Sequence, residues 1–224
     1  MNQLTEIEMQ AFKDEPGQKP RLLNEQEKSA AKTKLENTSP IKANAGVIKA
    51  GEGLTARQAA EKWAAENLPQ PLAFTTEVGE VEFDKKSVKN SLAHGYNQAK
   101  LDAIPTLPEG FESATYLGSL HDFDGQPIDN HYFAYPVNYN GELCYVFCRA
   151  RKDVNTNRLY VHEVFVTDKI KSSTLQTAAK LLHSKLHRGT ALYKSILSDV
   201  LNAKIQQNSD NPKLSEEKGG DNHY

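Results

Sequence analysis

The region from residue 114 to residue 168 constrains the fold more than any other part of the chain. It contains four segments rich in Tyr, Phe and Val, separated by turn sequences: TYLGSLHDF, NHYFAYPVNYN, ELCYVFCRARKD and NRLYVHEVFVTD. Asn140-Gly141, between two of these segments, is a strong β-hairpin signal because both residue types tolerate the positive φ of a tight turn. The pattern predicts a meander of three to four antiparallel strands.

Segments of helical character stand on both sides of this meander. Thr55 is a candidate N-cap for one helix, and Asp84 is a candidate N-cap for a second helix over about Lys86–Ile104. Alternation after Gly79 indicates a short strand between them, and residues 172–205 are again helical in character. The order predicts an α+β fold, with N-terminal helices packed on a three- to four-stranded antiparallel sheet and a C-terminal helical segment.

The two ends of the chain are too polar to form a packed core. Residues 1–52 contain one aromatic residue, Phe12, and residues 206–224 have a similar polar composition. Such segments bury too little apolar surface to offset the entropy that they lose on ordering. We therefore predict disorder over 1–52 and 206–224, and one domain over 54–205.

Charge, cysteines and motifs limit the classes of function. The formal net charge of −2 excludes a generally basic nucleic-acid binder but is compatible with a local basic patch. Cys144 and Cys148 lie on one face of a predicted strand, about 13 Å apart, which is too far for a disulfide. The sequence contains no phosphate-binding loop, dinucleotide fingerprint, zinc-protease motif, signal peptide or transmembrane-length run. No cofactor and no metal is predicted.

Residues 84–95, DKKSVKNSLAHG, form the first candidate site. On a helix, Ser87, Ser91 and His94 fall within about 60° of one another, beside an apolar stripe. Four lysines surround this row: Lys85, Lys86, Lys89 and Lys100. A solvated helix face without a function explains the same pattern, so the spacing alone leaves both interpretations open.

Two neighbouring strands provide the second candidate site. Alternation places on one face of the first strand Tyr145, Phe147, Arg149 and Arg151. On the next strand it places Tyr160, His162 and Val164 together and points Glu163 the other way. An arginine pair beside a tyrosine and a histidine suits an anionic ligand, since guanidinium offers a planar fork of donors to phosphate oxygens. The alternative is an exposed sheet face with cross-strand packing and no ligand.

The order of these motifs resembles the phage nuclease domains of the barnase–EndoU–colicin–RelE-like (BECR) fold. The resemblance covers about residues 54–205 and rests on GEVEF, KSVKNSLAHG, the aromatic strand pair, NRLYVHEV and ALYKSILSDVLNAK. Such domains occur in large polyvalent proteins of phages and conjugative elements. The resemblance implies a barnase-like sheet with N-terminal helices and a metal-independent ribonuclease of the toxin or effector type. An immunity or antitoxin protein is then a candidate partner. The absence of a signal peptide and of a transmembrane-length run predicts a cytoplasmic location, in a bacterial host.

The resemblance also implies roles for individual residues. The RNA, which could be a tRNA, would be cut by attack of its 2′-hydroxyl on the adjacent phosphate, a step that requires a base, an acid and cations. His94 and His162 are the predicted base and acid, in either order, because imidazole titrates near neutral pH. Lys89 and Arg151 complete the predicted catalytic set. The residues predicted to bind the substrate are Ser87, Ser91, Lys100, Arg149, Tyr160 and Tyr145, with Tyr145 or Phe147 stacking on a base.

Charge sets a condition for this function. Over residues 74–170, nine basic and fourteen acidic side chains give a formal charge of −5, so an RNA-binding surface requires the charges to be segregated. The alternative function is a catalytically inactive interaction module that keeps the fold and binds a protein partner. A nuclease requires His94 to lie within about 10 Å of the face that holds Arg151 and His162, whereas the interaction module does not.

Overall fold

The computed structural model describes residues 21–51, 53–68, 72–93, 97–121, 128–152, 158–167 and 188–203. The helices in these ranges are α2 (Glu25–Asn37), α3 (Ala56–Asn67), α4 (Lys85–Ala93), α5 (Gln98–Ala103), the 3-10 helix η1 (Ile104–Thr106), α6 (Leu107–Ser113) and α8 (Arg188–Leu201). The strands are β1 (Ile41–Ala43), β2 (Leu72–Thr76), β3 (Gly79–Phe83), β4 (Thr115–His121), β5 (Asp129–Tyr139), β6 (Glu142–Lys152) and β7 (Leu159–Thr167). The fold is α+β, as predicted.

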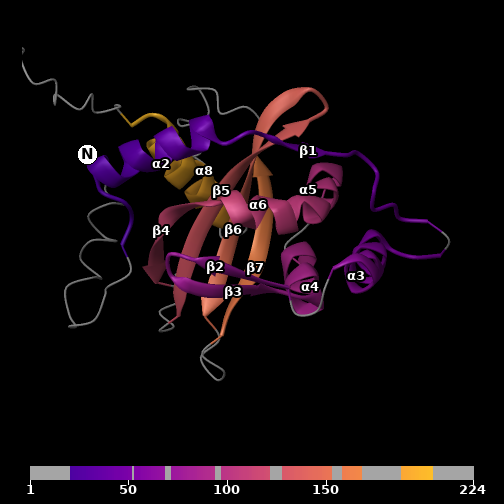
Figure 1. Ribbon diagram of the computed structural model, residues 1–224. Coiled ribbons are helices and arrows are strands. Elements are labelled where there is room, and N and C mark those ends of the chain that lie inside the picture. Colours follow the sequence, from indigo (N-terminus) through magenta and orange to yellow (C-terminus); the bar gives the residue numbers. More distant parts are fainter. Residues whose placement is uncertain are drawn as a thin grey trace, which may run out of the picture.

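The described strands form one curled sheet (Figure 1). Its order is β1-β5-β6-β7-β3-β2, and β4 pairs with the same edge of β5 as β1. The antiparallel meander β4–β7 agrees with the sequence prediction. The sheet is nevertheless larger than predicted and mixed, because β1 joins β5 in parallel and the β2–β3 hairpin joins β7 through a parallel β3–β7 pair.

Helices cover both faces of the sheet and create two hydrophobic cores. The first core lies between the sheet and α3–α6 and includes Tyr135 and Val146. The second core lies between the opposite face and the helices α2 and α8, and it includes Tyr132 and Phe147. Alternate residues of β5 and β6 therefore point into different cores, as the period of a strand requires. In Figure 1, α2 and α8 lie together at the upper left, and α3, α4 and α5 lie at the right.

Residues 21–51 belong to the packed fold, in contrast to the prediction of disorder over 1–52. Asn24 caps α2 in a capping box with Glu27, and Leu35 of the same helix is buried in the second core. The polar composition conceals this segment because its packing depends on a few buried apolar residues, such as Leu35, Ile41 and Ile48. Residues 1–20 and 206–224, for which disorder is also predicted, lie outside the described ranges.

The predicted helix over 86–104 is two helices in the structure. Asn97 begins α5 as a new N-cap, since its side chain accepts a hydrogen bond from the backbone nitrogen of Lys100 at 2.9 Å. Other local predictions are confirmed. Thr55 caps α3, and the β5–β6 turn has positive φ at Asn140 and Gly141.

Cys144 and Cys148 are buried free thiols that share the first core, as their even spacing predicts.

Candidate functional site

A β-bulge in β7 arranges the polar residues between β6 and β7. Arg151 lies opposite Tyr160, and Arg149 lies opposite Glu163, with a register shift between these pairs that makes His162 the additional residue of β7. Directly opposed residues share a face, so Tyr160 and Glu163 lie on the face that holds the two arginines. The prediction from strict alternation that Glu163 points the other way is therefore wrong.

An ionic network occupies this face. Arg149 Nη2 lies 3.1 Å from Glu163 Oε2, and only 13% and 12% of these side chains are exposed. Lys100 of α5 is also buried and donates a hydrogen bond to the carbonyl oxygen of Ser91 at 2.6 Å. Burial lowers the pKa of Lys100, and the negative charge of Glu163 opposes this effect. Arg149 and Lys100 thus both interact electrostatically with one carboxylate, that of Glu163.

Tyr160 stands between α4 and the bulge. Lys86 Nζ lies over the Tyr160 ring, 5.3 Å from its centroid, in cation–π geometry. The Tyr160 hydroxyl lies 3.5 Å from His162 Nδ1, and the two rings meet edge to face. The sequence places Lys86 among the lysines around the serine row but predicts no role for it, because its contact with β7 depends on the packing of α4 against the sheet rather than on local spacing.

The serines of α4 form hydrogen bonds within the protein. Beyond its pairing with β3, the edge of β7 meets α4, where the backbone nitrogen of Val164 donates to Ser91 Oγ at 2.9 Å. The backbone nitrogen and hydroxyl of Ser87 both donate to Asp84 Oδ1, at 2.8 and 3.1 Å. Both serines are completely buried. Their predicted contact with a substrate stays a prediction, and each hydroxyl already has a structural partner.

The other predicted residues lie in three different settings. Lys89 is exposed on α4. Tyr145 is half-buried against the second core, about 13 Å along β6 from Arg149 at ~3.3 Å per residue. Phe147, the other residue predicted to stack on a base, is buried in the same core. His94 lies outside the described ranges, as does its predicted approach to Arg151.

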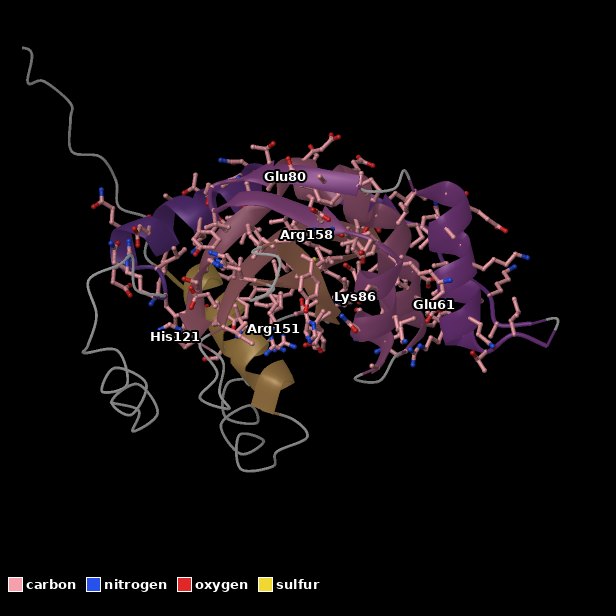
Figure 2. The ribbon with its side chains drawn as sticks, turned by 90° about the horizontal axis from the view of Figure 1, so that it is seen from below. Glu61, Glu80, Lys86, His121, Arg151 and Arg158 are labelled. Atoms are coloured by element: carbon pink, nitrogen blue, oxygen red, sulfur yellow. The ribbon has the colours of Figure 1, made fainter. Side chains whose placement is uncertain are left out.

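Figure 2 shows how the labelled charged side chains lie. Arg151, Lys86 and Glu61 lie below Arg158 in this view, and Glu80 lies at the top. Glu82 is neutralised by Arg158, whose Nε lies 2.7 Å from Glu82 Oε1. The segregation of charge that an RNA-binding surface requires stays a prediction.

Two further properties concern the described residues only. They contain no group of three or more His, Cys, Asp and Glu side chains placed to hold a metal ion. None of their helices is both long and apolar enough to cross a membrane.

The segment from α3 to the start of β7 also has a counterpart among known protein families. Residues 53–160 match the family model Large polyvalent protein-associated domain 3. The matched segment includes Lys86, Lys100, Arg149, Arg151 and Tyr160, and it ends before the bulge at His162. No curated protein and no solved structure matches the chain at a significant level.

Proposed function

We propose that the chain is a metal-independent endoribonuclease of the BECR fold, acting as a toxin or effector of a phage or mobile element. The bulged β6–β7 pair is the observation that supports this function. It gathers two arginines, a tyrosine, a histidine and a glutamate on one face, beside a lysine of α4. The match to a polyvalent protein-associated domain fits the same class of protein.

The cations of this face suit the phosphate of RNA. Arg151 and Lys86 flank Tyr160 and would bind the phosphate oxygens, and the Tyr160 hydroxyl would donate a third hydrogen bond. Arg149 is oriented by Glu163, so its guanidinium is fixed before the substrate arrives. Fixed positive charge is most effective where negative charge accumulates, which is on the phosphorane formed when the 2′-hydroxyl attacks.

His162 is our candidate for proton transfer on this face. Its imidazole is close to the Tyr160 hydroxyl that would hold the phosphate, and imidazole gains and loses a proton near neutral pH. The reaction needs a second proton-transfer group, because one group takes the proton of the 2′-hydroxyl and another gives a proton to the departing 5′-oxygen. His94 stays a candidate for this second group, and the carboxylate of Glu163 is another.

The test is cleavage of end-labelled RNAs, tRNA included, in the presence of EDTA. We expect products that end in a 2′,3′-cyclic phosphate. His162→Ala and Arg151→Ala should each lower the rate by about a hundredfold or more, because each removes a proton-transfer or charge-stabilising group. Melting temperatures of the variants show whether they remain folded.

Two variants serve as matched controls. His121→Ala removes a histidine that pairs with Asp129, and Arg57→Ala removes an arginine that pairs with Glu61 on α3. Both should cleave RNA at the rate of the unmodified protein. Absence of cleavage with every RNA, or full activity in both His162→Ala and Arg151→Ala, contradicts the proposed function.

A further inference from the structure

Asn130 of β5 is a completely buried amide without hydrogen bonds. Its exposed fraction is 0%, and neither its Oδ1 nor its Nδ2 has a partner in the part of the chain that the structure describes. Other completely buried polar side chains elsewhere in the described fold, Ser91 and Asp102, do have partners. A buried polar group that gains no hydrogen bond opposes folding, so an unpaired amide of this kind points to a role outside the folded chain's own stability.

The position of Asn130 connects it to the candidate site. It lies opposite Leu120 of β4 on one side and opposite Arg151 of β6 on the other. Arg151 in turn lies opposite Tyr160. Since directly opposed residues share a face with Cβ atoms about 5 Å apart, the amide lies on the face of the two arginines, and only strand β6 separates it from Tyr160 on β7.

The chemistry of an amide suggests what it binds. Its Nδ2 donates and its Oδ1 accepts, in one plane, which matches the adjacent donor and acceptor on the edge of a nucleobase. A phosphate, by contrast, offers acceptors only. We propose that Asn130 recognises the edge of a base next to the phosphate held by Arg151, which makes it a specificity-determining residue. This inference rests on RNA binding at the proposed site.

Because Asn130 is completely buried, a base can reach it only if neighbouring side chains move. Arg151 lies directly opposite Asn130 on β6, and its guanidinium is attracted by the phosphate. We expect Arg151 to turn toward the phosphate on binding, so that a base can reach the amide beside it. Binding of RNA and recognition of the base are then coupled through one side chain.

The experiment compares Asn130→Leu with the unmodified amide, both in a His162→Ala background that prevents cleavage. Fluorescence anisotropy measures the affinity for short single-stranded RNAs that contain only A, only C or only U. With Asn130 present, one base should bind about tenfold more tightly than the others. In Asn130→Leu this difference should fall to about twofold or less. The melting temperature should stay equal or rise, since leucine has a similar shape and no polar group to bury.

Thr115→Val is the matched control. Thr115 of β4 also has a buried oxygen without a partner among the described residues, and it lies opposite Ala134, four residues along β5 from Asn130. Removing its hydroxyl should leave the base preference unchanged. The control thus separates recognition at Asn130 from a general effect of deleting a buried polar atom.

Three results contradict the inference: equal binding of all bases by the protein with Asn130, a preference that survives in Asn130→Leu, or a lower melting temperature with uniformly weaker binding. The last result assigns Asn130 a structural role, for example through an ordered water. A different result would contradict the proposed function while leaving the inference intact. Base-selective binding that depends on Asn130, without any cleavage by the unmodified protein, supports the inference and contradicts the nuclease.

Discussion

The serine row of α4 and the arginine face of β6–β7 are the two candidate sites in the sequence, yet the structure gives them different surroundings. The hydroxyls of Ser87 and Ser91 bond to Asp84 and to the edge of β7, completely inside the protein. On the sheet, Arg151 and Tyr160 are only partly buried and adjoin Lys86. Polar spacing on a helix therefore identifies residues close to a site without showing which of them reach a ligand.

The largest expected effect on stability is at Arg149, because this residue of the sheet face forms a largely buried ion pair. Arg149→Met leaves Glu163 charged, largely buried and without its ion pair. Loss of one partner from a buried pair costs about 3–5 kcal/mol, and we expect an effect of this size on the free energy of unfolding in urea. Arg149→Met combined with Glu163→Leu should recover part of the loss, because the buried carboxylate is removed together with its arginine, while buried Lys100 loses the favourable charge of Glu163. A single variant as stable as the unmodified protein contradicts the structural role of the pair.

Ser91→Ala tests the other half of the contrast. The substitution leaves the backbone nitrogen of Val164 buried without its acceptor, and the free energy of unfolding should fall by about 1–3 kcal/mol. RNA cleavage below the melting transition should stay close to that of the unmodified protein. Lys89→Ala, at an exposed position of the same helix, is the control and should change stability by about 0.5 kcal/mol or less. If a stable Ser91→Ala protein loses cleavage, we would conclude that the serine row belongs to the site.

Local signals in the sequence predicted the parts of the fold that local physics determines. The turn at Asn140 and Gly141 follows from the conformations these residues tolerate, and the start of α3 follows from the pairing of Thr55 with Gln58. The meander follows because its strands are consecutive and joined by turn sequences. In each case residues within a few positions of one another carry the information.

The parts that were missed depend on distant residues. The three-residue strand β1 exists because β5 offers it a parallel edge. The bulge at His162 depends on how two strands align, and it reverses the predicted side of Glu163. Asn130 has no distinctive local sequence, and only its register opposite Arg151 places it in the site. Register is a property of a pair of strands. The alternation of residues within a single strand does not determine it.

Asp84→Ala tests whether the polar start of α4 serves the helix itself. The Asp84 carboxylate accepts hydrogen bonds from the nitrogen and the hydroxyl of Ser87, as an N-cap does. We expect a loss of about 1 kcal/mol in the free energy of unfolding, and Asp84→Asn should restore most of it because asparagine caps equally well. Equal losses in the two variants contradict the capping role and implicate the charge of Asp84 instead.

The smallest expected effect on stability is at Lys86. Its substitution tests whether α4 contributes a phosphate contact or only supports β7. Lys86→Ala removes the cation over the Tyr160 ring, and the free energy of unfolding should fall by about 0.5 kcal/mol, as for other exposed cation–π pairs. If Lys86 also contacts phosphate, the slope of log affinity for RNA against log salt should become shallower by about one unit, equally for all base compositions. Lys89→Ala, one turn along α4, should leave that slope unchanged. If the slope changes in Lys89→Ala and not in Lys86→Ala, we would infer that RNA binds on the solvent side of α4, away from Tyr160. An unchanged slope in both variants leaves the arginines of the sheet as the phosphate-binding cations and restricts α4 to supporting β7.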